Sequence, residues 1–262
     1  LAPTAVGAGI DTIGDSDWLP AVVPGGVHES LMAAGRIDDP YRDENESSIR
    51  WIEERDWWFR GTFAGPTDLA QDERVRLVFH GLDTVAELWL NGAPLGRHEN
   101  MFRPAEYDVT ALLGSTNEVV VRFSPPLDGL EVPPSVADSL ARLKSILGDI
   151  AEGTDDAPGI LSPDLGRATQ RRKATFSWGW DFGPRVPSIG IWRPVELRRE
   201  KVATISGHHV RTDAIHADGS ADVTVSVEVD AFAAGALTAR AVLTTPDGES
   251  YEVEVPVVDG SG

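Results

Sequence analysis

The sequence has no cysteine, only two methionines and an aromatic content of 7%. Without cysteine, disulfide frameworks, thiolate nucleophiles and cysteine-ligated metal sites are excluded. The compartment stays undetermined, because a cysteine-free chain suits reducing and oxidising surroundings alike. Runs of about 18 apolar residues are also lacking, so no membrane-spanning helix is predicted. Our expectation is a soluble, cytoplasmic protein without membrane contact.

Basic residues are also few: 23 Lys and Arg face 42 Asp and Glu, which gives a formal net charge of −19. Such a charge opposes binding to nucleic acid or to an anionic membrane, and neutral substrates fit better. The acidic net charge is explained equally well by solubility or by adaptation to salt. Most of the acids, such as Glu44, Glu46, Glu53 and Glu54, are expected to be solvated.

Motifs for several catalytic chemistries are missing. The chain has no Gly-x-Ser-x-Gly elbow, no phosphate-binding loop and no dinucleotide fingerprint. His208 and His209 are adjacent and would point to opposite faces of a strand, which makes them poor joint metal ligands. His28 is interpreted as structural. We therefore expect no metal and no cofactor.

Short runs of β-forming residues dominate the chain after residue 56, and they predict a mostly antiparallel sandwich. These runs are 57–63, 75–79, 85–90, 118–123 and 192–198. Asn91 and Gly92 follow one run directly, and this dipeptide tolerates positive φ, which predicts a tight hairpin.

Helices are expected in two places. Residues 27–34 predict a short helix that ends at Gly35, and apolar residues recur at helical spacing over 136–150. Residues 151–166 are rich in turn formers and predict a long surface loop. Near Lys201 a second unit begins, with alternating valines over 223–229 and a turn at 246–248. About 60 residues are too few for an immunoglobulin-like sandwich, so this domain is expected to be incomplete and both chain ends trimmed.

The most distinctive segment is the aromatic run Phe-Ser-Trp-Gly-Trp-Asp-Phe-Gly-Pro-Arg over residues 176–185. One interpretation is that Trp178, Trp180 and Phe182 alternate into a sandwich core. Against it, Asp181 would be desolvated between bulky rings, and an acid beside flat apolar faces suits the hydroxyls and C–H faces of a sugar. The basic residues 171–173 just before the run are expected to form a solvated strand edge.

These residues resemble the N-terminal part of the β-mannosidases of glycoside hydrolase family 2, over about residues 18–198. The matching positions are Trp18, 23–28 and Leu31; 37–41, Asn45, Glu46, Trp51 and 56–59; 81–84, Ala86, 90–92 and 100–102; Arg172, Lys173, 176–184 and 190–192. The resemblance implies an all-β chain with a jelly-roll, galactose-binding-like sandwich over 1–200, carrying one inserted helix. An incomplete immunoglobulin-like β-sandwich would follow over 201–262.

The resemblance also implies a function. The parent would be a retaining exo-enzyme that removes terminal β-D-mannose from the non-reducing ends of oligosaccharides. Trp180 would supply an apolar wall, Asp181 would bind a hydroxyl, and Phe182 would be a weaker neighbour where the family usually has a second Trp. The catalytic glutamates of the family lie on a downstream (β/α)₈ barrel, so no catalytic residue is assigned in this chain.

Besides Phe182, the chain departs from the family in one further place, and two alternatives for its function remain. No first strand is recognisable in residues 1–17, where the family has one. A free-standing carbohydrate-binding module would be a non-catalytic alternative, and it should bind sugar in isolation. In the second alternative, the parent is another exo-glycosidase of family 2, which acts on a β-glucuronide, a β-galactoside or a glucosaminide in place of a β-mannoside.

Overall fold

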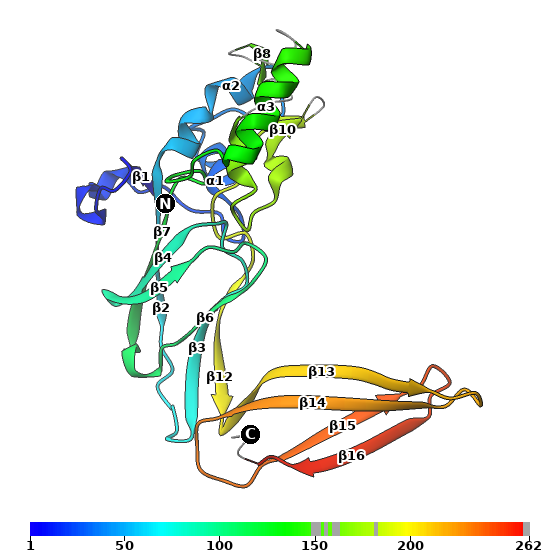
Figure 1. The fold of residues 1–262 in the computed structure, drawn as a ribbon. Helices are drawn as coiled ribbons and strands as arrows, with labels where there is room; N and C mark the ends of the chain where they lie inside the picture. The colour runs from blue at the N-terminus through cyan, green and yellow to red at the C-terminus, as the bar shows by residue number, and fades with distance from the viewer. Residues whose placement is uncertain (148–152, 155–156, 159–162, 181–182, 259–262) are drawn as a thin grey trace. The chain divides into compact units, whose positions relative to one another are not determined.

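A computed structural model describes residues 1–147, 153–154, 157–158, 163–180 and 183–258. The chain is mostly β and divides into two compact units. The first comprises residues 1–67 and 77–197, and the second comprises residues 68–76 and 198–262 (Figure 1). No helix among the described residues combines the length and the apolar character needed to cross a bilayer.

A five-stranded sheet in the order β1-β2-β7-β4-β5 is the main layer of the first unit. Its strands are β1 (Ala2–Thr4), β2 (Asp56–Ala64), β7 (Thr116–Phe123), β4 (Ala86–Leu90) and β5 (Ala93–His98). Neighbouring strands are antiparallel, with Trp57 opposite Phe123. In β4, Ala86, Leu88 and Leu90 are buried while Glu87 and Trp89 between them are only half-buried, as expected for a strand with one face on the core.

A second sheet has the order β12-β3-β6. It contains β3 (Glu73–Phe79), β6 (Ala105–Asp108) and β12 (Val195–Lys201). The predicted strand 192–198 therefore begins three residues late, after Pro194, which has no N–H to donate to a ladder. Buried side chains of the first unit, among them Trp57, Phe79, Leu82, Leu88 and Phe123, form its core.

Several local predictions are confirmed. Asn91 and Gly92 connect β4 to β5 with φ of 51° and 79°, and α1 (Val27–Ala33) is followed by Gly35 at φ 63°. The long amphipathic helix is α3 (Pro134–Leu147); its expected continuation to residue 150 lies outside the described residues. The chain also forms α2 (Asn45–Ser48) and two strands of two residues each, β8 (Gly153–Thr154) and β9 (Ala157–Pro158).

The first unit contains two elements that the sequence pattern does not indicate. The segment before Trp18, in which no strand is recognisable from the sequence, contains β1, which pairs with β2; its three residues are too short to give a pattern. The predicted loop 151–166 ends in a helix, α4 (Pro163–Ala168). Proline is compatible with the first helical position, where no N–H is needed, so Pro163 begins this helix rather than breaking it.

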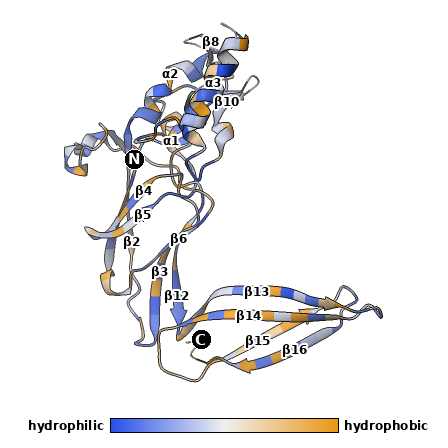
Figure 2. Cartoon of the chain, in the orientation of Figure 1, coloured by the Kyte–Doolittle hydropathy of each residue, from blue (hydrophilic) through white to orange (hydrophobic). Residues whose placement is uncertain are grey.

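The second unit contains two antiparallel hairpins, of which the turn at 246–248 predicts the second and the alternating valines predict one strand of the first. One joins β13 (Ala203–Ile215) to β14 (Ala221–Ala231), and the other joins β15 (Thr238–Thr244) to β16 (Ser250–Pro256). Hydrophobic residues alternate with polar ones along β14 and β16 (Figure 2). Buried within this unit, Arg74 pairs with Glu200 at 2.5 Å and with Asp230 at 2.7 Å.

Candidate functional site

The aromatic run folds into a short hairpin of β10 (Trp178–Trp180) and β11 (Gly183–Arg185). Trp178 pairs with Arg185 and Trp180 pairs with Gly183. Gly179 has φ of 88°, a conformation that glycine adopts without strain. Of the predicted site residues, the structure places the backbone of Trp180 in β10. Asp181, Phe182 and the side chain of Trp180 lie outside the described residues.

Trp178 and Phe176 have opposite environments. Trp178 is 1% exposed, so the core interpretation of the aromatic run is right for this ring. Phe176 lies in a 3₁₀ turn over Thr175–Ser177 and is 83% exposed. The run therefore contributes one ring to the core and presents another to solvent, and the role of the run is not the same at every position.

Arg185 is buried at the base of this hairpin. Its Nε and Nη2 atoms donate to the two carboxylate oxygens of Glu53 at 2.9 and 2.7 Å, and Nη2 lies 2.8 Å from Asp164. The backbone N–H of Arg185 donates to Glu46 at 3.2 Å. Burial alone would lower the pKa of Arg185, but hydrogen bonds and attraction from Glu53 and Asp164 outweigh burial and raise it. The expectation that Glu53 is solvated is wrong, because this carboxylate neutralises a buried guanidinium.

Lys173 and Asp83 form a second buried ion pair. Their side chains are 0% and 1% exposed, with Nζ 2.6 Å from Oδ2 of Asp83. Lys173 also donates to the carbonyl and the hydroxyl oxygens of Ser188 at 2.7 and 3.0 Å. Burial lowers the pKa of Lys173, and the charge of Asp83 offsets part of this effect. The expectation of a solvated edge at 171–173 is therefore wrong for Lys173, which also lies 5.5 Å from the ring centroid of Trp178.

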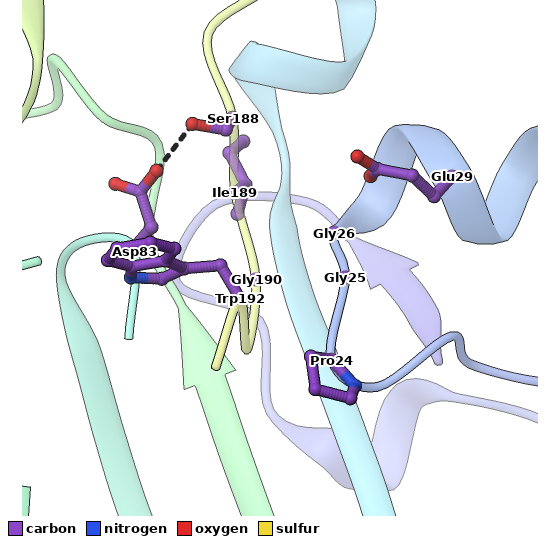
Figure 3. Close-up of a pocket in the computed structure, with 9 residues that line it drawn as sticks. All are labelled: Pro24, Gly25, Gly26, Glu29, Asp83, Ser188, Ile189, Gly190 and Trp192. Atoms are coloured by element: carbon purple, nitrogen blue, oxygen red, sulfur yellow. Dashed lines mark hydrogen bonds between the residues drawn. The ribbon is translucent and has the colours of Figure 1, made fainter. Parts of the chain in front are cut away.

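A cavity of about 170 Å³ lies beside this pair (Figure 3). Its lining includes Asp83, Ser188 and Trp192 on one side and Gly26 and Glu29 on the other. Pockets that hold a drug-sized ligand usually measure about 300–1,000 Å³. The cavity is therefore large enough for a few water molecules and too small for an oligosaccharide.

The walls of the cavity are held together through their backbones. Asp83 and Gly190 exchange two hydrogen bonds, at 2.9 and 2.8 Å. Gly190 has φ of 145°, and a Cβ atom there would lie 2.7 Å from Cα of Gly26. Only glycine allows this close approach of the two segments.

The histidines do not form a metal site in the part of the chain that the structure describes. His28 is buried in α1, and burial lowers its pKa to about 4, with smaller effects from Glu29, which raises it, and Lys173, which lowers it. His28 is therefore neutral at pH 7. His208 and His209 are exposed neighbours on β13, and no cluster of three or more potential ligands occurs among the described residues.

Sequence reasoning missed both buried ion pairs. Lys173 and Asp83 are 90 residues apart, and Arg185 and Glu53 are 132 residues apart. Lys173 and Asp83 lie at positions of the family resemblance. Nothing in the local spacing of these four residues predicts which acidic side chain forms an ion pair with which basic one.

Comparison with known proteins gives consistent results. Residues 9–193 match the family model described as glycosyl hydrolase 2 galactose-binding domain-like. A β-mannosidase from Mus musculus is 32% identical over 185 residues, which are 71% of this chain and 20% of that protein. β-Mannosidase B from Emericella nidulans is 30% identical over 246 residues, or 93% of this chain and 27% of that protein.

Among solved structures, a β-D-mannosidase from Dictyoglomus thermophilum superposes with a TM-score of 0.67 at 28% identity. The alignment covers 94% of this chain and 29% of that structure. The chain thus spans between a fifth and a third of the length of these relatives. A family match over more than half of the chain and a galactose-binding-like β-sandwich identify it as a member of the glycosyl hydrolase 2 galactose-binding domain-like family.

Proposed function

We propose that this chain is the N-terminal, substrate-recognition part of a retaining exo-β-mannosidase, which hydrolyses terminal β-D-mannose from the non-reducing ends of oligosaccharides. The observation that carries the proposal is the similarity to proteins named β-mannosidase over 71% to 93% of this chain. A (β/α)₈ barrel beyond residue 262 would supply the acid and the nucleophile. In this proposal the domains are a jelly roll over 1–200 and part of an immunoglobulin-like sandwich over 201–262.

Sugar recognition is assigned to the tip of the aromatic hairpin. Trp180 offers a flat apolar face for the C–H groups of a pyranose, Asp181 accepts a hydrogen bond from a hydroxyl, and Phe182 adds apolar contact. The support is the firm base of this hairpin, where Trp178 is buried and Arg185 is paired with Glu53. A recognition group is effective when its support is fixed before the substrate arrives.

Hydrolysis of an aryl β-mannoside tests the proposal. The protein encoded by the complete reading frame should release the aryl group, and the 262-residue chain alone should not. Turnover by the chain alone would contradict the assignment of catalysis to a later domain. If the enzyme cleaves an aryl β-glucuronide, β-galactoside or glucosaminide as fast as the β-mannoside or faster, the proposed specificity for mannose is wrong. Calorimetry of the chain alone with mannobiose should give weak binding or none, whereas tight binding would support a free-standing binding module.

The role of Asp181 has its own test. If its carboxylate makes a charge-assisted hydrogen bond to the substrate, Asp181→Ala in the complete enzyme should cost about 1.5–3 kcal/mol of transition-state stabilisation. This is a loss in kcat/KM of roughly 10- to 150-fold. Asp218→Ala, in an exposed turn of the second unit, is the matched control and should leave kcat/KM unchanged. Unchanged kcat/KM in Asp181→Ala would make Asp181 structural.

A further inference from the structure

We propose that Arg185 is a positioning residue: this buried side chain and the half-buried Glu53, Asp164 and Glu46 form a cluster that fixes the orientation of the β10–β11 hairpin. We call these four residues the Arg185 cluster. The inference rests on the proposed function, in which this hairpin presents Trp180 and Asp181 to the sugar. It adds a residue that contacts no substrate and acts on catalysis through the hairpin.

The hairpin depends on such an anchor because it forms a sheet of its own. β10 and β11 pair only with each other among the described strands, and their register contains two paired positions. An isolated two-stranded hairpin is marginally stable in water, so side-chain contacts must set its orientation. Arg185 is suited to this because it ends β11 directly opposite the buried Trp178.

The Arg185 cluster joins the hairpin to three other segments of the first unit. Glu53 belongs to the 3₁₀ helix Arg50–Glu54, Glu46 to α2 and Asp164 to α4. Arg185 is 8% exposed, and the side chain of Glu53 is 12% exposed. An ion pair so far from water gains little net stability over an apolar contact of the same volume. Its advantage is direction, because a guanidinium that bonds both oxygens of one carboxylate is held in one plane.

Lysine cannot replace this geometry. Arg185→Lys keeps the positive charge, but an ammonium is a point charge without the two parallel donors that meet Glu53. The second unit offers a matched control: Arg74 is also 8% exposed and also bridges two carboxylates, those of Glu200 and Asp230. Arg74→Lys makes the same chemical change in the other unit, at a residue that has no part in the Arg185 cluster.

The experiment measures kcat/KM for an aryl β-mannoside with the complete enzyme, for each lysine variant in the unmodified and the Asp181→Ala backgrounds. Arg185→Lys should lower kcat/KM about 10- to 100-fold in the unmodified background, since displacement of a recognition group by about 1 Å can cost this much. In the Asp181→Ala background the loss should be clearly smaller than in the unmodified background, because one of the two positioned groups is gone and only Trp180 remains. Arg74→Lys should change kcat/KM less than about 2-fold in both backgrounds.

Far-ultraviolet circular dichroism, which reports on both units, must confirm that each variant is folded at the assay temperature. If Arg185→Lys does not fold, Glu53→Gln replaces it, since the amide keeps the shape and one acceptor of the carboxylate. An equal loss in both backgrounds, or no loss in the unmodified one, would overturn the positioning role. Failure of the proposed function looks different: the unmodified enzyme would not cleave the mannoside, or Asp181→Ala alone would have no effect. The positioning role would then fall with it.

Discussion

Replacing Lys173 with methionine should destabilise the first unit by about 3–5 kcal/mol, the usual cost of removing one partner of a buried ion pair. Methionine keeps most of the aliphatic stem, so little packing volume is lost. What remains is the carboxylate of Asp83, 1% exposed, with the hydroxyls of Ser188 and Thr84 as its side-chain donors. The cost arises because this charge stays buried without its counter-ion.

Urea unfolding followed by tryptophan fluorescence is the assay. All eight tryptophans belong to the first unit, so this signal reports on that unit and not on the second. The double variant Lys173→Met/Asp83→Asn removes both charges and should recover at least half of the loss. Arg97→Met is the control, because Arg97 pairs with Glu99 at the surface, where ion pairs contribute less than about 1 kcal/mol.

Two results would refute this reasoning. A loss below about 1 kcal/mol in Lys173→Met would mean that Asp83 finds water or another donor in its place. A double variant as unstable as the single variant would mean that lost packing around Lys173, and not the unpaired charge, causes the instability. The difference between the single and double variants is the quantity to measure.

Two further predictions concern the same region. The pKa of His28 is about 4 in the folded chain and near 6.5 in the unfolded chain, so only the unfolded state binds a proton between these pH values. The free energy of unfolding should therefore fall by up to about 3 kcal/mol as the pH is lowered from 7 to 4. His28→Gln should make the free energy of unfolding less dependent on pH in this range. A pKa near 6.5 for His28 in the folded protein, measured by NMR, would contradict the prediction. Gly190→Ala should destabilise the first unit by about 2–5 kcal/mol, because strain at φ 145° adds to a 2.7 Å clash with Gly26. Gly35→Ala, at φ 63° in open space, should cost only about 1 kcal/mol in the same urea assay, and equal losses would show that the clash is absent.

The sequence was sufficient wherever a local rule decides the structure. The hairpin at Asn91 and Gly92 follows from two residues that tolerate positive φ, and α1 and α3 follow from apolar spacing and a glycine stop. β1 could not be predicted in this way. Its three residues carry too little pattern, and the strand exists only because β2 offers hydrogen-bonding partners.

The candidate site was less predictable than the fold. The residues of the aromatic run singled it out, but the acids that support it belong to segments that are distant in sequence, such as Glu53 for Arg185. Lys173 was assigned to solvent because lysine is seldom fully buried unless it is paired, and its partner is 90 residues away. Pairing of charges over such distances is decided by tertiary packing, which composition and periodicity do not encode.

The composition of the second unit bears on the order in which the protein folds during synthesis. Arg74 and Arg76 are made early, but their partners Glu200 and Asp230 follow 126 and 154 residues later. At about 5–20 residues per second, Arg74 waits roughly 6–25 s for its first acid. Residues 68–76 therefore lack these ion-pair partners until residues 200 and 230 have been synthesised. The second unit can therefore form its buried ion pairs only after every residue of the first unit has been synthesised.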